Sequence, residues 1–305
     1  ELEHLVPHDV IADVGRRQKV AERALIFGGF QDLRVERLRD YRERASSLGQ
    51  QGAVERFERN EVTLREHGFS DLLVVTNFPI ALVAYGFTRM SIKPAEATTM
   101  LRSFPPTKQG SARKPLFVSS TETEGVFLEL DAVQVRDWLV DNEFWPTHTR
   151  ELGSDVSAIK ARLLEDAHAG TRAYPGVHLL CHTIAHTLIR NLGERAGFGE
   201  ETMAEYLIPE TLTIGLYANV HQEFTLGALV SLVEHNLRSW MEASRAGAEV
   251  CTWDPICEHG EGACANCLHL AFGCEHRNHD LDRAVLFGSV NDDREPYFQR
   301  GFWQY

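Results

Sequence analysis

Several features that mark other protein classes are scarce or missing in this chain of 305 residues. Its longest mainly apolar run, from Phe78 to Phe87, is too short to cross a bilayer and contains a proline. The N-terminus carries no signal-peptide pattern, so we expect a cytoplasmic protein with no membrane contact. Repeats and low-complexity linkers are also missing. The first residue is Glu1 rather than Met, and whether the chain is a separate subunit or a fragment of a longer protein stays open.

Basic residues are outnumbered, 31 against 44 acidic ones, which gives a formal net charge of −13. A negative net charge argues against a stand-alone, strongly basic nucleic-acid binder. Two enzymatic signatures are missing as well, the G-x-x-x-x-G-K-[ST] phosphate loop and the G-x-S-x-G nucleophile elbow. We therefore expect no ATP chemistry of the P-loop type in this chain.

The hydrophobic pattern favours a mixture of helices and strands. From Gln31 to Glu66, arginines alternate with acidic residues over a narrow apolar stripe, which predicts two solvated helices. Short β-branched and aromatic runs predict strands, and Pro115–Leu130 predicts a hairpin that turns at Thr121–Gly125. The other predicted strands cover Leu72–Val75, Ile80–Phe87 and Leu212–Val220, and further helices cover Val156–Ala169, Val177–Ala196 and Leu226–Ala246.

Strands interleaved with helices predict a mixed α/β fold, a sheet with packed helices, followed by a C-terminal four-cysteine zinc lobe. Five aromatic residues lie among the last nine, and we expect them to pack on the body rather than form a free docking peptide. The expected segments are a charged helical N-terminal segment (1–70), a mixed α/β body (71–250), the zinc-binding lobe (251–290) and an aromatic tail (291–305).

Cysteine is rare outside one short segment. Five of the six cysteines lie between Cys251 and Cys274, and only Cys181 lies elsewhere. A disulfide framework would spread its cysteines, so this cluster indicates one metal site in a reducing compartment. The Cys264-x2-Cys267 turn offers two thiolates, and two more complete the tetrahedron of a closed structural zinc site. The predicted Zn²⁺ ligands are Cys257, Cys264, Cys267 and Cys274, with Cys251 as the substitute; His259, His269 and His276 are weaker candidates.

Two enzymatic patterns lie near these cysteines. His259-Gly260-Glu261 before the Cys264–Cys267 pair matches parts of a nucleobase-deaminase signature, but the short spacing cannot supply the separate helices of such a site. The run His276–His279 has the letters of a His-Asn-His nuclease without its spacing. A zinc-dependent nucleic-acid-modifying enzyme, of nuclease or deaminase type, is thus the alternative hypothesis. A histidine ligand or an open coordination position at the metal of the cysteine cluster would favour this enzymatic alternative.

Three histidines recur every fourth residue in one helical pattern, at His178, His182 and His186. No glutamate follows His182 in the manner of an H-E-x-x-H zinc motif. Apolar residues surround the three positions, so we prefer packed core histidines over metal ligands, and their role stays open.

Positive charge gathers in one stretch of this acidic chain. From residue 89 to residue 114, six basic residues face Glu96 alone, a net charge of +5. This stretch is the best candidate for contacts with a nucleic-acid backbone, and a solvated loop that offsets acidic neighbours is the alternative. The acidic cysteine segment, in contrast, should not enter a DNA groove. The candidate nucleic-acid contacts are Arg89, Lys93, Arg102, Lys108, Arg113 and Lys114.

The cysteine segment resembles the MrfA-like zinc-binding domain of helicase-associated proteins. The residues that carry this resemblance are Cys251-x2-Asp254-Pro255-x-Cys257, Ala263-Cys264-x2-Cys267-Leu268 and Cys274-Glu275-x2-Asn278-x2-Leu281-Asp282-Arg283. Upstream elements are similar to those of the helicase-associated subunit of DISARM anti-phage systems, over about Leu72 to Leu286. These elements are Gly86-Phe87-Thr88-Arg89, Glu124-Gly125-Val126-Phe127-Leu128 and His182-Thr183-x2-His186-x-Leu188-Ile189.

The resemblance implies a non-catalytic accessory subunit or domain that binds DNA jointly with a superfamily 2 helicase, in anti-phage defence or DNA repair. It also implies zinc on the same four cysteines, while Asn278 and Asp282 match positions that could cap a helix start. MrfA-type proteins fuse this domain to a motor, and this sequence holds no motor motif. We therefore expect the helicase as a partner or as a further part of a longer chain. A purely structural interaction protein is the third hypothesis.

Overall fold

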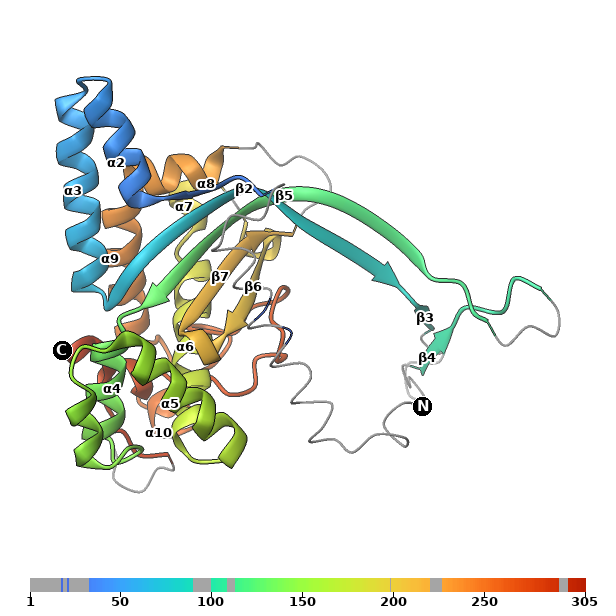
Figure 1. Cartoon of the computed structure of the whole chain (residues 1–305). Coiled ribbons are helices and arrows are strands. Elements are labelled where there is room, and N and C mark those ends of the chain that lie inside the picture. Colours follow the sequence, from blue (N-terminus) through green and yellow to red (C-terminus); the bar gives the residue numbers. More distant parts are fainter. Residues whose placement is uncertain are drawn as a thin grey trace.

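The computed structural model describes residues 18, 21, 33–89, 100–108, 113–197, 199–219, 227–290 and 296–305. An antiparallel five-stranded sheet forms its centre, and a two-stranded sheet lies at the end of a long arm (Figure 1). The strands are β1 (Val35–Arg37), β2 (Phe69–Ala84), β3 (Gly86–Arg89), β4 (Met100–Ser103), β5 (Phe117–Leu130), β6 (Met203–Ile208) and β7 (Thr213–Ala218). The central order is β1-β2-β5-β7-β6, and β3 pairs with β4.

Helices cover the central sheet and carry the chain between its strands. The α-helices are α2 (Leu38–Ser47), α3 (Gln51–Glu66), α4 (Ala132–Asp141), α5 (Val156–Ala169), α6 (Ala173–Arg190), α7 (Gly193–Ala196), α8 (Ala228–Ser231), α9 (Leu237–Glu249), α10 (Ile256–His259) and α11 (Ala284–Phe287). Four 3₁₀ turns cover Thr147–Leu152, Glu200–Thr202, Pro209–Thr211 and Phe302–Gln304, and a π-helical turn, Leu232–Asn236, joins α8 to α9.

Both faces of the sheet are closed near its centre. Successive side chains of a strand point to opposite faces. Leu72 and Val74 therefore belong to the main core, which the helices cover, while Leu73, Val75 and Phe127 form a smaller cluster on the other face. Helix α6 lies against β6 and β7, and its buried residues are central to the main core.

The predicted mixed α/β class is confirmed. Helix α5 also has the predicted bounds. At its start the Asp155 side chain accepts a hydrogen bond from the Ala158 N–H, and at its end Gly170 adopts a left-handed conformation. The charged segment forms α2 and α3, bridged by the Arg42–Glu61 ion pair at 2.8 Å. Residues 1–17, 19–20 and 22–32 of the predicted N-terminal segment lie outside the described residues.

The predicted hairpin within Pro115–Leu130 is wrong. Strand β5 runs without a turn through residues 121–125 and pairs with β2 along almost its whole length. Thr121 and Thr123 are β-branched and suit a strand, and they lie opposite Ile80 and Phe78. Backbone groups that a local turn would have paired are thus paired with a distant strand.

Strand β2 is also longer than its two predicted pieces, because it continues through Asn77 and Pro79. Its register with β5 is irregular between Val75 and Phe78, and β1 pairs only with residues 73–75. Beyond that point, in the part of the chain that the structure describes, β2 pairs with β5 on one side and has no neighbouring strand on the other. The missing N–H of Pro79 is tolerated at such an edge. From there β2 and β5 extend away from the body as a two-stranded arm that carries β3 and β4 (Figure 1).

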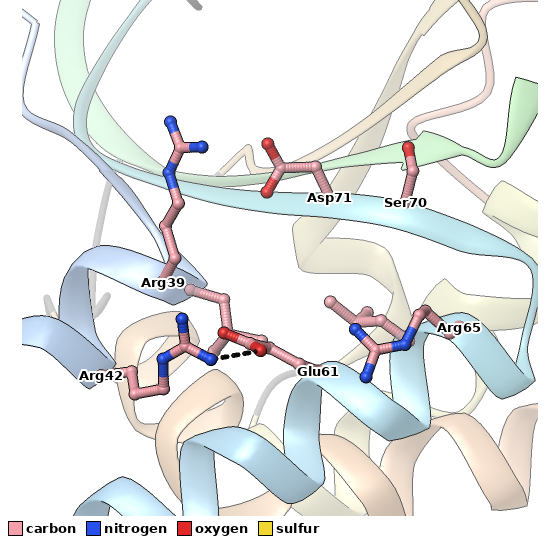
Figure 2. Close-up of a pocket in the computed structure, with 8 residues that line it drawn as sticks. Arg39, Arg42, Glu61, Arg65, Ser70 and Asp71 are labelled. Carbon is pink, nitrogen blue, oxygen red and sulfur yellow. Dashed lines mark hydrogen bonds and ion pairs between the residues drawn. The ribbon is translucent and has the colours of Figure 1, made fainter. Parts of the chain in front are cut away.

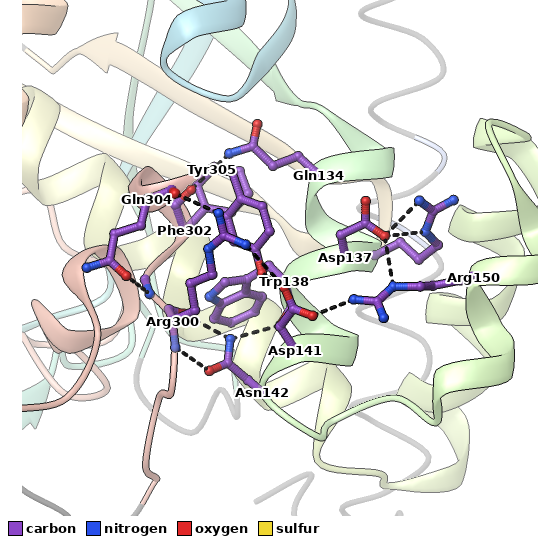
Figure 3. Close-up of polar contacts among 12 residues, drawn as sticks. Gln134, Asp137, Trp138, Asp141, Asn142, Arg150, Arg300, Phe302, Gln304 and Tyr305 are labelled. Atoms are coloured by element: carbon purple, nitrogen blue, oxygen red, sulfur yellow. Dashed lines mark hydrogen bonds and ion pairs between the residues drawn. The ribbon is translucent and has the colours of Figure 1, made fainter.

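The aromatic tail packs against the body. Phe298, Phe302 and Trp303 are buried, and the Phe298 ring stacks on Trp138 of α4 at 5.8 Å between centroids. The Trp303 indole N–H donates to the His67 carbonyl at 3.1 Å. Figure 3 shows the polar rim of this contact, where Tyr305 reaches Asp141 on α4.

Among the described residues, every helix falls short of the length or the apolar character that a bilayer crossing requires.

Replacing Trp303 with alanine should lower the free energy of unfolding by about 3–5 kcal/mol, because a large buried side chain and its hydrogen bond are lost. Urea denaturation measures this loss. Tyr305→Phe is the control, since it removes only a hydroxyl at the rim and should cost less than about 1.5 kcal/mol. Equal losses in the two variants would contradict a core role for Trp303.

Candidate metal centres

Four cysteines converge in the C-terminal lobe. The sulfur atoms of Cys251, Cys257, Cys264 and Cys267 all lie within 4.8 Å of one another. Cys257 lies on the short helix α10. Cys264 and Cys267 share one tight turn, in which the Cys267 N–H donates to the Cys264 carbonyl. A cluster of this kind could hold one metal ion.

The distances between these sulfur atoms fit a tetrahedral zinc site. The Sγ–Sγ distance is 3.5 Å for Cys251–Cys264 and 3.7 Å for both Cys257–Cys267 and Cys264–Cys267. Four sulfurs at ~2.3 Å from a single ion lie about 3.8 Å apart. The same distances are far too long for a disulfide, in which the sulfurs are ~2.05 Å apart, and all four cysteines are free.

The surroundings favour a thiolate most clearly at Cys264, whereas burial raises the pKa of Cys257 and raises that of Cys267 to about 11. Backbone N–H groups of Trp253 and Cys264 point at the sulfurs of Cys251 and Cys267, at 3.4 and 3.2 Å. Burial opposes ionisation of Cys264, but hydrogen bonds from the Asn266 N–H and from neighbouring thiols outweigh it and lower the pKa of Cys264 to about 7. Four thiolates around Zn²⁺ would carry two negative charges, and the buried guanidinium of Arg283 offsets part of this charge.

The four cysteines that the structure brings together differ from the predicted ligand set in one member. Cys274 lies apart from the four-cysteine group, and Cys251, the predicted substitute, takes its place. Spacing along the chain could not distinguish the two, because either loop could fold back on the Cys264–Cys267 turn.

Cys274 instead joins a second cluster, formed with His182, His186 and Glu205. The two histidines lie one turn apart on α6, and Glu205 lies on β6. The histidines are buried, as the sequence interpretation expected, yet they face a carboxylate and a thiol rather than apolar side chains alone.

The second cluster places two imidazoles beside one buried carboxylate. Burial opposes protonation of His182, but hydrogen bonding to Cys274 and Glu205 outweighs it and raises the pKa of His182 to about 9. Burial likewise opposes ionisation of Glu205, yet the two histidines hold the pKa of this carboxyl far below its usual range. The cluster therefore favours a cation beside a carboxylate.

Five of the six basic candidates lie on the arm. Arg102, Lys108, Arg113 and Lys114 are exposed near its tip, where the Lys114 ammonium donates to Ser103 Oγ at 2.8 Å. Arg89 ends β3, and nothing is described of its side chain; Lys93 lies outside the described residues. Aromatic rings accompany the charges, since Phe104 packs between Phe87 and Phe117 with centroid distances of 6.0 and 4.9 Å.

A separate pocket lies between α2, α3 and β2, and it contains three arginines (Figure 2). Arg42 pairs with Glu61, and Asp71 on the opposite wall pairs with Arg37. The two carboxylates offset much of the positive charge of the arginines. This supports the interpretation of the N-terminal helices as surfaces laced by ion pairs.

Comparison with known proteins gives a partial similarity to an anti-phage protein. No protein-family model matches the sequence. Over 191 residues the chain is 27% identical to DISARM protein DrmB of Bacillus paralicheniformis. This chain is similar to a DISARM protein. The match covers 58% of this chain but only 33% of DrmB, so the chain corresponds to about a third of that protein.

Replacing Cys251 with serine should remove one zinc ion per chain, because three thiolates and a hydroxyl hold zinc much more weakly than four thiolates. Metal analysis of the purified protein measures the loss. His259→Ala is the matched control, since His259 is exposed in the same lobe and lies outside the cluster. Full zinc content in Cys251→Ser would contradict its place among the ligands.

Proposed function

We propose that the chain is a non-catalytic, zinc-binding accessory component of a DISARM-type anti-phage system that acts in the cytoplasm. The observation that carries this proposal is the similarity to DISARM protein DrmB, together with a four-cysteine cluster of zinc geometry. The four-cysteine cluster lies in the part of the chain that resembles helicase-associated proteins.

Zinc has a structural role in this proposal. Four thiolates fill the coordination sphere and leave no position for water or substrate. The lobe has only a small apolar cluster of its own, made largely of the cysteines and a few aliphatic residues. An ion that ties Cys251 to Cys267 would therefore supply much of the stability of this segment.

A superfamily 2 helicase is the partner we propose. The sequence resemblance favours this partner, and the chain holds no phosphate-loop motif that would let it hydrolyse ATP as a P-loop motor. ATP-driven movement would belong to the helicase, in a separate subunit or in another part of a longer protein. This chain would contribute to DNA binding and to assembly of the complex.

The arm is the element that we propose contacts DNA. Exposed arginines and lysines near its tip supply charge for phosphates, and the rings of Phe87, Phe104 and Phe117 supply faces on which bases can stack. The alternative, a protein partner without DNA contact, is favoured by exposed apolar residues along the same arm, Leu82, Val83 and Val118.

Reversing the charge of Arg102, Lys108, Arg113 and Lys114 to glutamate distinguishes these two roles. DNA binding by the complex should weaken, and the slope of log affinity against log salt should fall by about 0.9 for each phosphate that the arm no longer neutralises. Fluorescence anisotropy over a salt series measures both quantities.

The matched control reverses four exposed arginines on the helices, Arg39, Arg59, Arg65 and Arg238. It makes the same change in net charge away from the arm, and its salt slope should stay close to that of the unmodified chain. Unchanged DNA binding in the arm variant, or an equal loss in both variants, would remove the arm from the proposed DNA contact.

Affinity purification of the chain from its native host should recover a superfamily 2 helicase. The ATPase rate of that helicase on DNA should change when the purified chain is added, because an accessory subunit alters how the motor holds DNA. The same ATPase assay with Cys251→Ser compares the unmodified chain with one whose four-cysteine cluster has lost a ligand. Recovery of no motor protein would count against the proposed function.

A further inference from the structure

Four ligand atoms of mixed chemistry converge outside the four-cysteine cluster. They are Nε2 of His182 and His186 on α6, a carboxylate oxygen of Glu205 on β6, and Sγ of Cys274 in the lobe, all within 4.8 Å of one another. We infer that these residues form a second zinc site, which joins the body of the protein to its C-terminal lobe.

The distances match those between ligands of one tetrahedral ion. His182 Nε2 lies 3.2 Å from Glu205 Oε1 and 3.3 Å from Cys274 Sγ, and His186 Nε2 lies 3.3 Å from Glu205 Oε2. With zinc bonds of ~2.0–2.3 Å, tetrahedral ligands are separated by about 3.4 Å for nitrogen and oxygen and 3.6 Å for nitrogen and sulfur.

The outer nitrogen of each histidine fixes which ring atom faces the site. His182 Nδ1 lies 3.0 Å from the Asp280 carbonyl oxygen, and His186 Nδ1 lies 2.8 Å from the Leu268 carbonyl oxygen. A carbonyl only accepts hydrogen bonds, so each Nδ1 carries the proton. In the neutral ring, Nε2 then presents a lone pair to the site. Metal-bound histidines show this same outer hydrogen bond.

With both rings neutral and no metal ion bound, acceptor atoms would face one another in this cluster. His186 Nε2 and Glu205 Oε2 are both fully buried, and neither has a hydrogen-bond partner among the described residues. Buried acceptors that face acceptors are costly. Two neutral imidazoles, one carboxylate and one thiolate around Zn²⁺ give a neutral site, which can be buried without a remaining charge.

The remaining two ligands are held in ways that suit a metal site. The Glu275 N–H donates to Glu205 Oε1 at 3.0 Å, and the Asn278 N–H donates to Cys274 Sγ at 3.1 Å. Gly273 pairs with β6 so closely that a Cβ there would lie 2.1 Å from the Met203 carbonyl oxygen. Only glycine allows this approach, which places Cys274 beside Glu205.

The chemistry of the four ligands selects zinc and a structural role. Histidine, carboxylate and thiolate together suit a borderline ion such as Zn²⁺, whereas Mg²⁺ and Ca²⁺ prefer oxygen alone. All four coordination positions come from the protein, and three of the four residues are fully or almost fully buried. No coordination position remains for a substrate, so the site is a structural zinc site that joins the body to the lobe rather than a catalytic centre.

The competing explanation is a metal-free cluster in which protonated histidines pair with Glu205. Native mass spectrometry of the unmodified chain tests it without any substitution, because two zinc sites add two ions per chain. X-ray absorption at the zinc edge gives the ligands: two loaded sites average about 2.5 sulfurs per zinc, and a four-cysteine site alone gives 4. One ion with four sulfur ligands would overturn the proposal.

Variants separate the two sites. Cys274→Ser and Glu205→Gln should each lose one zinc ion and raise the mean sulfur count per zinc toward 4, while Cys251→Ser should lose the other ion and lower that count toward 1. His178→Ala is the control. His178 lies on the same face of α6 as His182, but its Nε2 contacts His276 Nε2 of the lobe at 3.0 Å, and it is not one of the four ligands. It should keep both ions.

The two sites can fail independently. Zinc that is lost in Cys274→Ser but kept in Cys251→Ser supports the second site even if the four-cysteine cluster binds nothing. Zinc that is kept in full by both Cys274→Ser and Glu205→Gln would overturn the second site and leave the four-cysteine site, and the function proposed from it, untouched.

Discussion

Two hydrogen bonds from α6, donated by His182 and His186 to the Asp280 and Leu268 carbonyls, hold the cysteine lobe against the body. The lobe depends on such contacts because its own apolar cluster is small. Arg190 adds a hydrogen bond to the His269 carbonyl at 2.9 Å, from the same helix. Helix α6 therefore joins the sheet, on which it packs through β6 and β7, to the lobe, which it contacts through its polar side chains. Placement of either candidate metal centre follows from this one helix.

Local features of the fold could be predicted from the sequence. The bounds of α5 are marked by Asp155 and Gly170, a cap at each end, and both signals lie within a few residues of the helix. The short turn that brings Cys264 and Cys267 together is local in the same sense. The charged helices α2 and α3 were recognisable because the narrow apolar stripe repeats at helical spacing along each of them.

Features that depend on distant pairing could not be predicted in this way. A turn expected at residues 121–125 is replaced by pairing with β2, some 45 residues earlier in the chain. The exchange of Cys274 for Cys251 depends on the pairing of Gly273 with β6, which no spacing of cysteines encodes. Histidines four apart on α6 were visible, but Glu205 and Cys274 come from a strand and a loop far along the chain. Without them, packed histidines were the simpler interpretation.

The register irregularity between Val75 and Phe78 has a mechanical consequence for the arm. On the body side, β1 and β7 flank the β2–β5 pair; beyond the irregularity, among the residues that the structure describes, these two strands pair only with each other. The β2–β5 ladder therefore links the arm to the central sheet, so a pull on the tip acts along strands that are hydrogen-bonded to β7 and, through β7, to β6, the strand that carries Glu205.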